Sequence, residues 1–316
     1  KHALPQLPWV YLFLSFLALE PVLRIGRILY YNSSWNRRSW TRVTVEALPG
    51  EATRVEFSIP RSWNGKPGSH TYVYLPRLTP LSMHPFSVAW HTCSGYAKLD
   101  SEKFHSSIED LRIADGPSTV SCIIRARTGM TRSLYDRASK AKTGRIELWG
   151  AIEGPYGVNH SLHSYGTVVL FAAGSGITHQ LLFVRHLLAG YNDDMSATRR
   201  ILLVWCIPNI ECVEWIYPWL KELSVMPNYS DIVQLRIYVS RSTPQKGETR
   251  SLHNKAEIYS QRCNPQEIVD DQILAQVGAM VVTVCGPGGF NDSVRAAVRR
   301  RVGLRSIDFF EEAFSS

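Results

Sequence analysis

The stretch VVLFAAGSGITHQLLFVRHLL, residues 168–188, constrains the fold more than any other part of the chain. A continuous apolar run typical of a buried strand meets a turn of small residues, and helical spacing follows directly. Gly174, Ser175 and Gly176 lie at the joint, where the free N–H groups of a helix start attract an anion such as a phosphate. A plain strand-to-helix turn needs the same residues, and position 179 is His where the full G-x-G-x-x-G pattern has Gly. The turn alone therefore leaves both interpretations open.

From residue 167 onward, apolar strand-like runs alternate with helical stretches. Continuous apolar strands separated by helices predict a doubly wound parallel sheet that is covered on both faces. Ligands bind such a sheet outside the carboxyl ends of its strands, and a second Gly-rich turn, residues 286–289, follows one of these strands. We expect residues 241–264 to form a loop insertion, residues 307–314 to form a last strand, and Asn291 or Asp292 to cap the helix after the second turn.

Residues 39–157 follow a different pattern, in which six short strands are separated by turn residues. This spacing predicts a small antiparallel barrel. Pro85 lies near the start of one strand and cannot donate a hydrogen bond to a sheet, so this strand is expected at an edge or beside a ligand. A helix is predicted over 131–142, opened by Thr131, and the polar residues 98–118 are expected on the surface.

The composition narrows the class of protein. The chain has 316 residues, 45% of them hydrophobic, which is enough for two globular domains. Its net charge of +8 comes from small basic clusters with no nucleic-acid motif, so we expect no nucleic-acid partner. The six cysteines form no CxxC pair and no metal-ligand spacing, which indicates a reducing compartment and no metal site.

The start of the chain has the character of a membrane segment. An uncharged run from Leu4 to Leu19 is broken by Pro5 and Pro8 and is short for a complete span. Basic residues follow at Arg24, which places the rest of the chain in the cytoplasm by the positive-inside rule. An amphipathic or buried helix is the alternative. We expect residues 1–34 to be the end of a transmembrane helix and a linker.

Seven motifs in a fixed order carry a resemblance to a known family. They are KPGSH (66–70), HPFS (84–87), IRARTGMTRSLY (124–135), EGPYG (153–157), AAGSGIT (172–178), VCGPGGFNDSVR (284–295) and FFEEAFS (309–315). The chain resembles the FAD- and NADPH-binding half of the ferric-chelate reductase and NADPH oxidase family, which is ferredoxin-reductase-like, and it resembles the ferric reductases most. The resemblance implies a Greek-key FAD-binding β-barrel over residues 35–160 and an NADPH-binding α/β domain over residues 161–316.

The resemblance also assigns roles to residues. On the flavin side, His84 and Pro85 would lie near the FAD phosphates or ribityl chain, Phe86 would pack on the isoalloxazine ring, and Ser87 would bond near its N5 atom. The backbone of Gly129, Met130 and Thr131 would hold the FAD pyrophosphate, helped by Arg125. Glu312 and Phe314 would cover the flavin from the other side.

On the nicotinamide side, the resemblance implies that Gly174, Gly176, Ile177 and Thr178 hold the dinucleotide. Cys285, Gly286 and Pro287 would lie beside the nicotinamide C4 atom, although strand packing alone would also explain Cys285. With Ser87 and Phe314, Cys285 completes the set of residues expected at the reacting atoms.

Three positions depart from the family pattern. His179 replaces a Pro, and we expect its side chain to face solvent. Pro208 and Asn209 occupy the place where many relatives carry an Arg for the 2′-phosphate of NADPH, so Arg241 is the expected substitute and NADH use stays open. Ser316 stands where relatives usually end in an aromatic residue, which leaves the aromatic cover of the flavin open.

The implied function is that of a membrane-attached NAD(P)H-dependent oxidoreductase. Hydride would pass from NADPH to FAD, and single electrons would then pass through haem in another part of the parent protein to a ferric chelate. The implied partners are the haem-carrying membrane bundle, the membrane and the ferric chelate, and the implied location is the plasma membrane with these domains facing the cytoplasm. An oxidase that produces superoxide and a non-catalytic regulatory or binding module are the alternatives.

Overall fold

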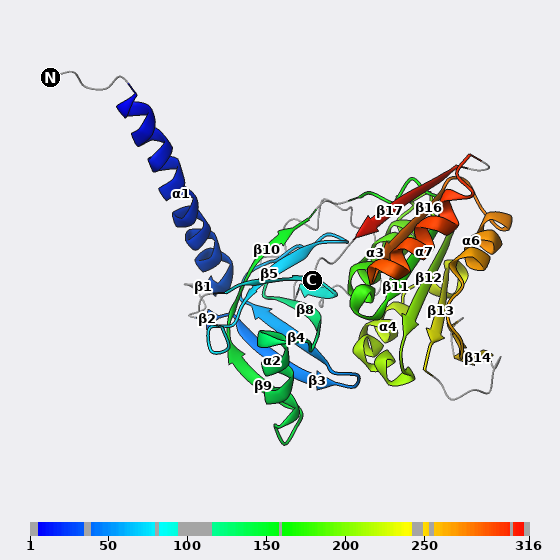
Figure 1. Ribbon diagram of the computed structural model, residues 1–316, viewed down its shortest axis with the longest axis horizontal. Helices are drawn as coiled ribbons and strands as arrows, with labels where there is room; N and C mark the ends of the chain where they lie inside the picture. The colour runs from blue at the N-terminus through cyan, green and yellow to red at the C-terminus, as the bar shows by residue number, and fades with distance from the viewer. Residues whose placement is uncertain are drawn as a thin grey trace.

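The computed structural model describes residues 6–34, 39–79, 82–93, 116–157, 160–241, 249–252, 256–303 and 306–312. It has three parts: a projecting helix, an antiparallel β unit and an α/β unit (Figure 1).

The β unit consists of two antiparallel sheets that share their ends. One sheet has the order β7-β8-β4-β3-β9 and the other the order β10-β5-β6. β9 continues into β10 through Gly150, and β6 is separated from β7 by only two residues, so the sheets join on both sides as in a closed barrel. The predicted antiparallel barrel is confirmed. Its strands are β3 (Arg42–Leu48), β4 (Ala52–Ile59), β5 (His70–Tyr74), β6 (His84–Ser87), β7 (Trp90–Cys93), β8 (Ser118–Arg125), β9 (Arg145–Trp149) and β10 (Ala151–Tyr156).

Gly150 makes one of the two barrel corners possible. A Cβ atom at this position would lie 2.7 Å from the Tyr74 carbonyl oxygen and 2.9 Å from Cγ2 of Val43. Only glycine lets the strand cross from one sheet to the other so close to its neighbours. The barrel interior beneath the corner is filled by fully buried apolar side chains such as Val43, Val55 and Phe57.

The α/β unit is built on six parallel strands in the order β15-β13-β12-β11-β16-β17, with β14 antiparallel at one edge. Apolar side chains fill both faces of this sheet, and the face that packs against α3 is continuous with the barrel core. The predicted doubly wound sheet is confirmed. Its strands are β11 (Thr167–Ala173), β12 (Arg200–Ile207), β13 (Val233–Val239), β14 (Thr249–Leu252), β15 (Ala256–Tyr259), β16 (Met280–Cys285) and β17 (Ile307–Glu312). Its main helices are α3 (Ile177–Asn192), α4 (Tyr217–Ser224), α5 (Tyr229–Ile232), α6 (Pro265–Leu274) and α7 (Gly288–Arg299).

Three local predictions were wrong. The expected loop insertion over 241–264 contains β14 and β15, because this segment supplies the edge strands that extend the sheet. α7 begins at Gly288, inside the Gly-rich segment 286–289, and has no side-chain cap from Asn291 or Asp292. The helix α2 (Gly129–Ser139) begins two residues before Thr131. Most of the expected surface segment 98–118 lies outside the described residues.

Helix α1 (Leu7–Asn32) projects away from the barrel (Figure 1). Large apolar side chains along most of its length are exposed, Trp9 and Phe13 among them. Within the described part of the chain, however, no helix meets both the length and the hydropathy that a membrane crossing needs. The expectation that residues 1–34 end a transmembrane helix therefore stays a prediction.

Candidate active site

The two Gly-rich turns of the α/β unit lie side by side. β11 and β16 are neighbouring parallel strands, with Ala172 opposite Cys285, and a turn follows each strand at its carboxyl end. The strand order reverses between these two strands, because β12 extends the sheet beyond β11 and β17 extends it beyond β16. Such a switch point is where open α/β sheets bind nucleotides.

The glycines of the first turn have different roles. Gly174 has a φ of +54°, and a Cβ atom there would meet nothing within 4 Å, so its backbone faces open space. Trp205 fixes this peptide by donating from its indole N–H to the Gly174 carbonyl at 2.9 Å. In contrast, a Cβ atom on Gly176 would collide with the Cys285 carbonyl, so Gly176 permits the two turns to pack together. A phosphate can therefore approach Gly174, whereas Gly176 shapes the site.

The residues next to these glycines are largely engaged in packing. Ile177 is fully buried, and Thr178 donates from its hydroxyl to the Ser175 carbonyl at 2.9 Å. Cys285 is also fully buried, and burial and the nearby Glu312 carboxylate raise the pKa of its thiol, which keeps the sulfur neutral. Gly286 lets the second turn approach Ala173, whose Cβ atom would lie 2.9 Å from a Cβ at position 286. Pro287 precedes the first residue of α7.

The strand β6 carries the predicted flavin residues at the edge of the three-stranded sheet. Its edge position is as predicted, and Pro85, which has no N–H to donate, is exposed there. Ser87 lies opposite His70 of β5, and Phe86 lies opposite Thr71 and packs against the barrel core. His84 and Phe86 are neighbours, with ring centroids 6.4 Å apart.

A second open backbone site lies at the start of α2. Gly129 has a φ of +58°, and a Cβ atom there would meet nothing within 4 Å. The Met130 side chain is buried, so only its backbone can reach a ligand, and Thr131 holds the loop by accepting from the Arg127 N–H at 3.0 Å. Arg125 is exposed at the end of β8. This combination of free helix N–H groups, an open glycine and a nearby guanidinium fits a pyrophosphate.

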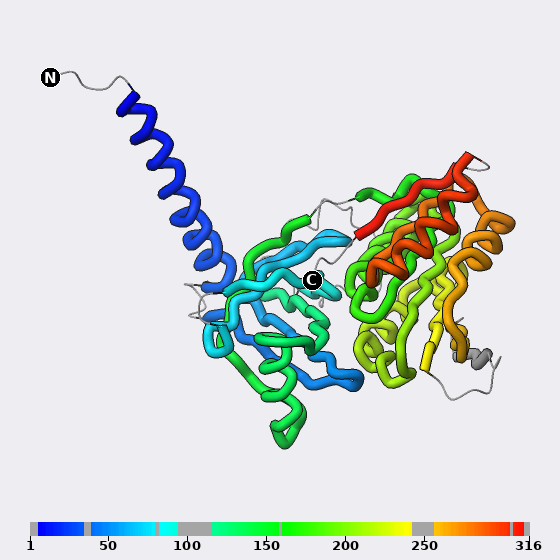
Figure 2. Tube along the Cα trace, viewed as in Figure 1, coloured from blue at the N-terminus to red at the C-terminus, as the bar shows by residue number. Residues whose placement is uncertain are grey.

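β6, which carries Ser87, and β16, which carries Cys285, each have a neighbouring strand whose residues lie toward the other unit. His70 lies opposite Ser87, and Glu312 lies opposite Cys285. The Glu312 carboxylate acts on His70 and partly offsets the lowering of the His70 pKa by burial, so β5 and the end of β17 are close in space. Figure 2 shows the C-terminal strand running from the far side of the α/β unit toward the barrel. The first Gly-rich turn also lies against β8.

The contact between the two units corrects the expectation for His179. Its side chain is only 7% exposed, and its Cε1 atom would lie 3.0 Å from a Cβ atom on Gly68 of the barrel. Burial, together with the neighbouring His160, lowers the His179 pKa to about 4. The side chain therefore packs neutral between the units, where the absence of a Cβ on Gly68 gives it room.

A tryptophan-rich contact extends this interface. Trp90 of the barrel stacks on Trp219 of α4 with ring centroids 6.0 Å apart, and its indole N–H donates to Glu222 at 3.0 Å. Arg54 of β4 donates to the Trp215 carbonyl at 3.0 Å. Two stacked indoles and a guanidinium that bonds across the boundary hold the units in one arrangement.

Arg241 and the C-terminal residues are the last of the predicted site residues. Arg241 is exposed at the end of β13, and its backbone N–H donates to the Pro208 carbonyl at 2.9 Å, so it lies at the carboxyl edge of the sheet. Phe314 and Ser316 lie outside the described residues. Sequence reasoning gave no role to His70 or to the Glu153 carboxylate, although the motifs KPGSH and EGPYG contain them.

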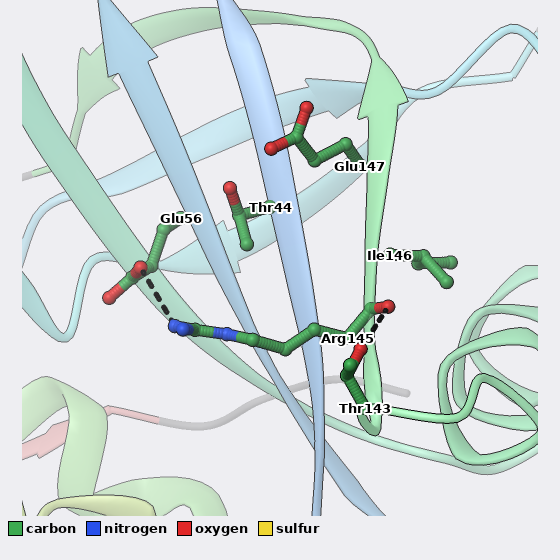
Figure 3. Close-up of a pocket in the computed structure, with 6 residues that line it drawn as sticks. All are labelled: Thr44, Glu56, Thr143, Arg145, Ile146 and Glu147. Carbon is green, nitrogen blue, oxygen red and sulfur yellow. Dashed lines mark hydrogen bonds and ion pairs between the residues drawn. The ribbon is translucent and has the colours of Figure 1, made fainter.

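A shallow pocket on the outer face of β3, β4 and β9 is separate from β6 and the Gly-rich turns (Figure 3). Arg145 reaches Glu56 across it at 4.0 Å. None of the predicted site residues lines this pocket, whose walls are Thr44, Glu56, Thr143, Arg145, Ile146 and Glu147.

Comparison with known protein families agrees with this geometry. Residues 37–99 match an FAD-binding domain, and residues 165–299 match the ferric reductase NAD binding domain. In both of these domains the chain is similar to ferric reductases. The two domain matches identify FAD and a nicotinamide nucleotide as its cofactors and indicate an NAD(P)H-dependent oxidoreductase.

Individual relatives support the assignment. Ferric reductase transmembrane component 3 of Saccharomyces cerevisiae is 25% identical over 98% of this chain and 43% of its own length. The probable cell surface ferric reductase kap2 of Aspergillus oryzae is 29% identical over 54% of this chain and 21% of its own length. The chain thus spans less than half of these relatives. The solved structure of phthalate dioxygenase reductase shares the fold, with a TM-score of 0.53 and 14% identity over 86% of this chain and 68% of that chain.

Proposed function

We propose that this chain is the flavin and nicotinamide part of a membrane-attached ferric-chelate reductase. The observation that carries the proposal is the contact between the two units beside the predicted sites: the first Gly-rich turn lies against β8, and Gly68, two residues before His70, packs against His179 of α3. His70 in turn lies opposite Ser87. Two nucleotides bound at the two open glycines would face each other in one crevice. FAD would supply the chemistry of accepting a hydride and releasing electrons singly.

The protein residues would bind and orient. The Ser87 hydroxyl, on a side chain that is 9% exposed, can donate or accept a hydrogen bond and so suits a flavin nitrogen in either oxidation state. The backbone at Gly129 and Thr131 would hold the FAD pyrophosphate, with Arg125 adding charge. Gly174 would hold the pyrophosphate of the dinucleotide, and neutral Cys285 would border the nicotinamide.

Arg241 would select NADPH. It lies beside Pro208 at the carboxyl edge of the sheet, where β12 separates its strand β13 from β11 and the first Gly-rich turn. An exposed guanidinium at this edge can form a charge-assisted contact with a 2′-phosphate.

The proposal also covers the path that electrons take after they leave the flavin. The yeast relative is named a transmembrane component, and the exposed apolar surface of α1 suits a membrane. We infer that α1 leads to a haem-carrying membrane bundle of the parent protein. That bundle would pass electrons to a ferric chelate at the plasma membrane, with the FAD- and NAD-binding domains in the cytoplasm.

The test is steady-state reduction by the full-length protein in membranes, with ferric chelate and oxygen compared as acceptors and NADPH compared with NADH. The proposal expects rapid NADPH-dependent ferric reduction with little oxygen consumption. Oxygen consumption with superoxide release would support an oxidase instead. A protein that binds FAD but reduces neither acceptor nor a soluble dye would be a non-catalytic module.

A further inference from the structure

The carboxylate of Glu153, in β10, accepts hydrogen bonds from four side chains. Its side chain is 2% exposed. Arg24 of α1 donates to both of its oxygens, from Nε at 3.0 and 3.1 Å and from Nη2 at 2.9 Å. Arg27, one turn further along α1, donates from Nη2 at 2.9 Å. Two guanidiniums of the projecting helix are thus bound to one carboxylate of the barrel.

Two phenols complete the environment of this carboxylate. Tyr74 and Tyr156 each donate a hydroxyl to Glu153 at 2.6 Å. Burial and the hydrogen bond to Glu153 raise the pKa of Tyr74 to about 12, so this phenol stays a donor. The guanidiniums also lie over aromatic rings, Arg27 at 5.0 Å from the Tyr156 centroid. A buried carboxylate with all of its bonds made is held in one position.

A second anchor lies two turns from Arg24 along the same helix. The fully buried Asn32 side chain donates to the Ile152 carbonyl at 2.7 Å and accepts from the Ile152 N–H at 3.0 Å. The C-terminal part of α1 is therefore bonded to two consecutive residues of β10, whereas its N-terminal half exposes its side chains.

β10 pairs with β5, and β5 pairs with β6, the strand whose residues would hold the flavin. Glu153 lies opposite Tyr72 of β5, and Tyr72 lies opposite Pro85 of β6. Tyr156 lies opposite His70, which lies opposite Ser87. The contacts of α1 are thus two strands away from the residues that would hold the flavin.

We propose that Glu153 is a positioning residue that fixes helix α1 relative to Ser87 and thereby sets the distance from the flavin to the acceptor reached through α1. The inference rests on the proposed function, because it assumes that electrons leave the flavin toward that acceptor. It concerns only this outward step, and the delivery of hydride within the crevice needs no contact with α1.

The test compares two rates in the full-length membrane protein: NADPH-dependent reduction of a soluble dye, which takes electrons from the flavin, and reduction of ferric chelate. Glu153→Gln removes the charge and keeps the shape. It is expected to leave dye reduction close to wild type and to lower ferric reduction by about 10- to 100-fold, up to the cost that a misplacement of 1 Å can carry. Hydrogen exchange of residues 24–32 should become faster.

Two further variants keep the test decisive. Glu147→Gln makes the same change on the outer face of β9 and should alter neither rate. Tyr74→Phe removes one bond to Glu153 and should give a smaller loss of ferric reduction, and it decides the matter if Glu153→Gln does not fold. An unchanged ratio of the two rates, or a parallel fall of both, would overturn the inference. A wild-type protein that reduces no dye would instead refute the proposed function.

Discussion

At the scale of single residues, Ser87 is the side chain on which the proposed chemistry depends most. It ends the edge strand β6, is nearly buried, and lies opposite His70 at the point where the barrel approaches Glu312. A hydroxyl at this position can follow a flavin nitrogen through reduction without moving.

Replacing Ser87 by alanine tests this role. Ser87→Ala should lower NADPH-dependent dye reduction about 100-fold with little change in stability, because one oriented hydrogen bond to the reacting atoms is lost. Ser87→Thr keeps the hydroxyl and serves as the matched control. An alanine variant that reduces dye at the wild-type rate would show that the hydroxyl has no part in the reaction.

Arg241 carries the prediction for nucleotide choice. Arg241→Ala should raise KM for NADPH about tenfold, the effect of one lost hydrogen bond to a charged group, and leave KM for NADH unchanged. Arg42→Ala is the control, because it also removes one positive charge, but from an exposed position on the barrel. Equal effects on both nucleotides would place the 2′-phosphate elsewhere.

Residue roles were the least predictable part of the molecule. Ser87, Gly129 and Gly174 could be selected from motifs because backbone openness follows from local turn chemistry. His179 and Glu153 could not, because their burial depends on partners more than 100 positions away, Gly68 for the first and Arg24 for the second.

At the scale of elements, the site depends on how two strand-to-helix turns fit together. Gly174 and Gly176 are only two positions apart, yet one faces open space and the other faces the Cys285 carbonyl. The two glycines therefore predict different consequences for the same substitution.

Gly174→Ala should cost about 1 kcal/mol of folding free energy, because alanine is strained at positive φ, and should raise KM for NADPH. Gly176→Ala should lower the free energy of unfolding by about 3 kcal/mol, because the new methyl group meets backbone that cannot move away. Urea unfolding and steady-state kinetics on both variants check the contrast. Equal losses of stability would contradict the assignment of separate roles.

The elements themselves were largely predictable. Alternation and apolar runs identified six of the eight barrel strands and β11, β12, β13, β16 and β17, because burial on one or both faces leaves a clear pattern. The short strands β7 and β10 were not predicted as separate strands, since each follows its neighbour within two residues. β14 and β15 escaped prediction because they are short strands at the exposed edge of the sheet, with only half-buried side chains in β15. The predicted start of α7 was too late because the prediction required a polar capping residue. The helix begins instead at Gly288, directly after Pro287, without a side-chain cap.

At the scale of the whole molecule, buried and half-buried histidines lie where the two units meet. Burial lowers the pKa values of His179, His91 and His186 to about 4. Each is then neutral in the folded protein, whereas its pKa in the unfolded chain is about 6.5. The unfolded state therefore binds more protons as pH falls below 6.5, and the stability present above that pH is lost toward pH 4.

For His179 alone this loss amounts to about 2 kcal/mol between pH 7.5 and pH 5.0. His179→Gln should reduce the difference in unfolding free energy between these two pH values by that amount. Phe183→Leu, which alters the same contact without a titratable group, should lower stability equally at both pH values. A glutamine variant with the wild-type pH dependence would show that His179 is not buried in neutral form.

The two-unit architecture could be predicted from the change of pattern near residue 160, but the packing between the units could not. Trp90, Trp219 and Arg54 belong to separate elements whose sequences give no sign that they meet.

The most direct test of the central claim is anaerobic mixing of the FAD-loaded chain with NADPH while the flavin absorbance is followed. If the Ser87 strand and the Cys285 strand share one crevice, the flavin is bleached in a single fast phase that slows when the transferred hydrogen at nicotinamide C4 is deuterium. A chain that binds both nucleotides and leaves the flavin oxidised would contradict the account.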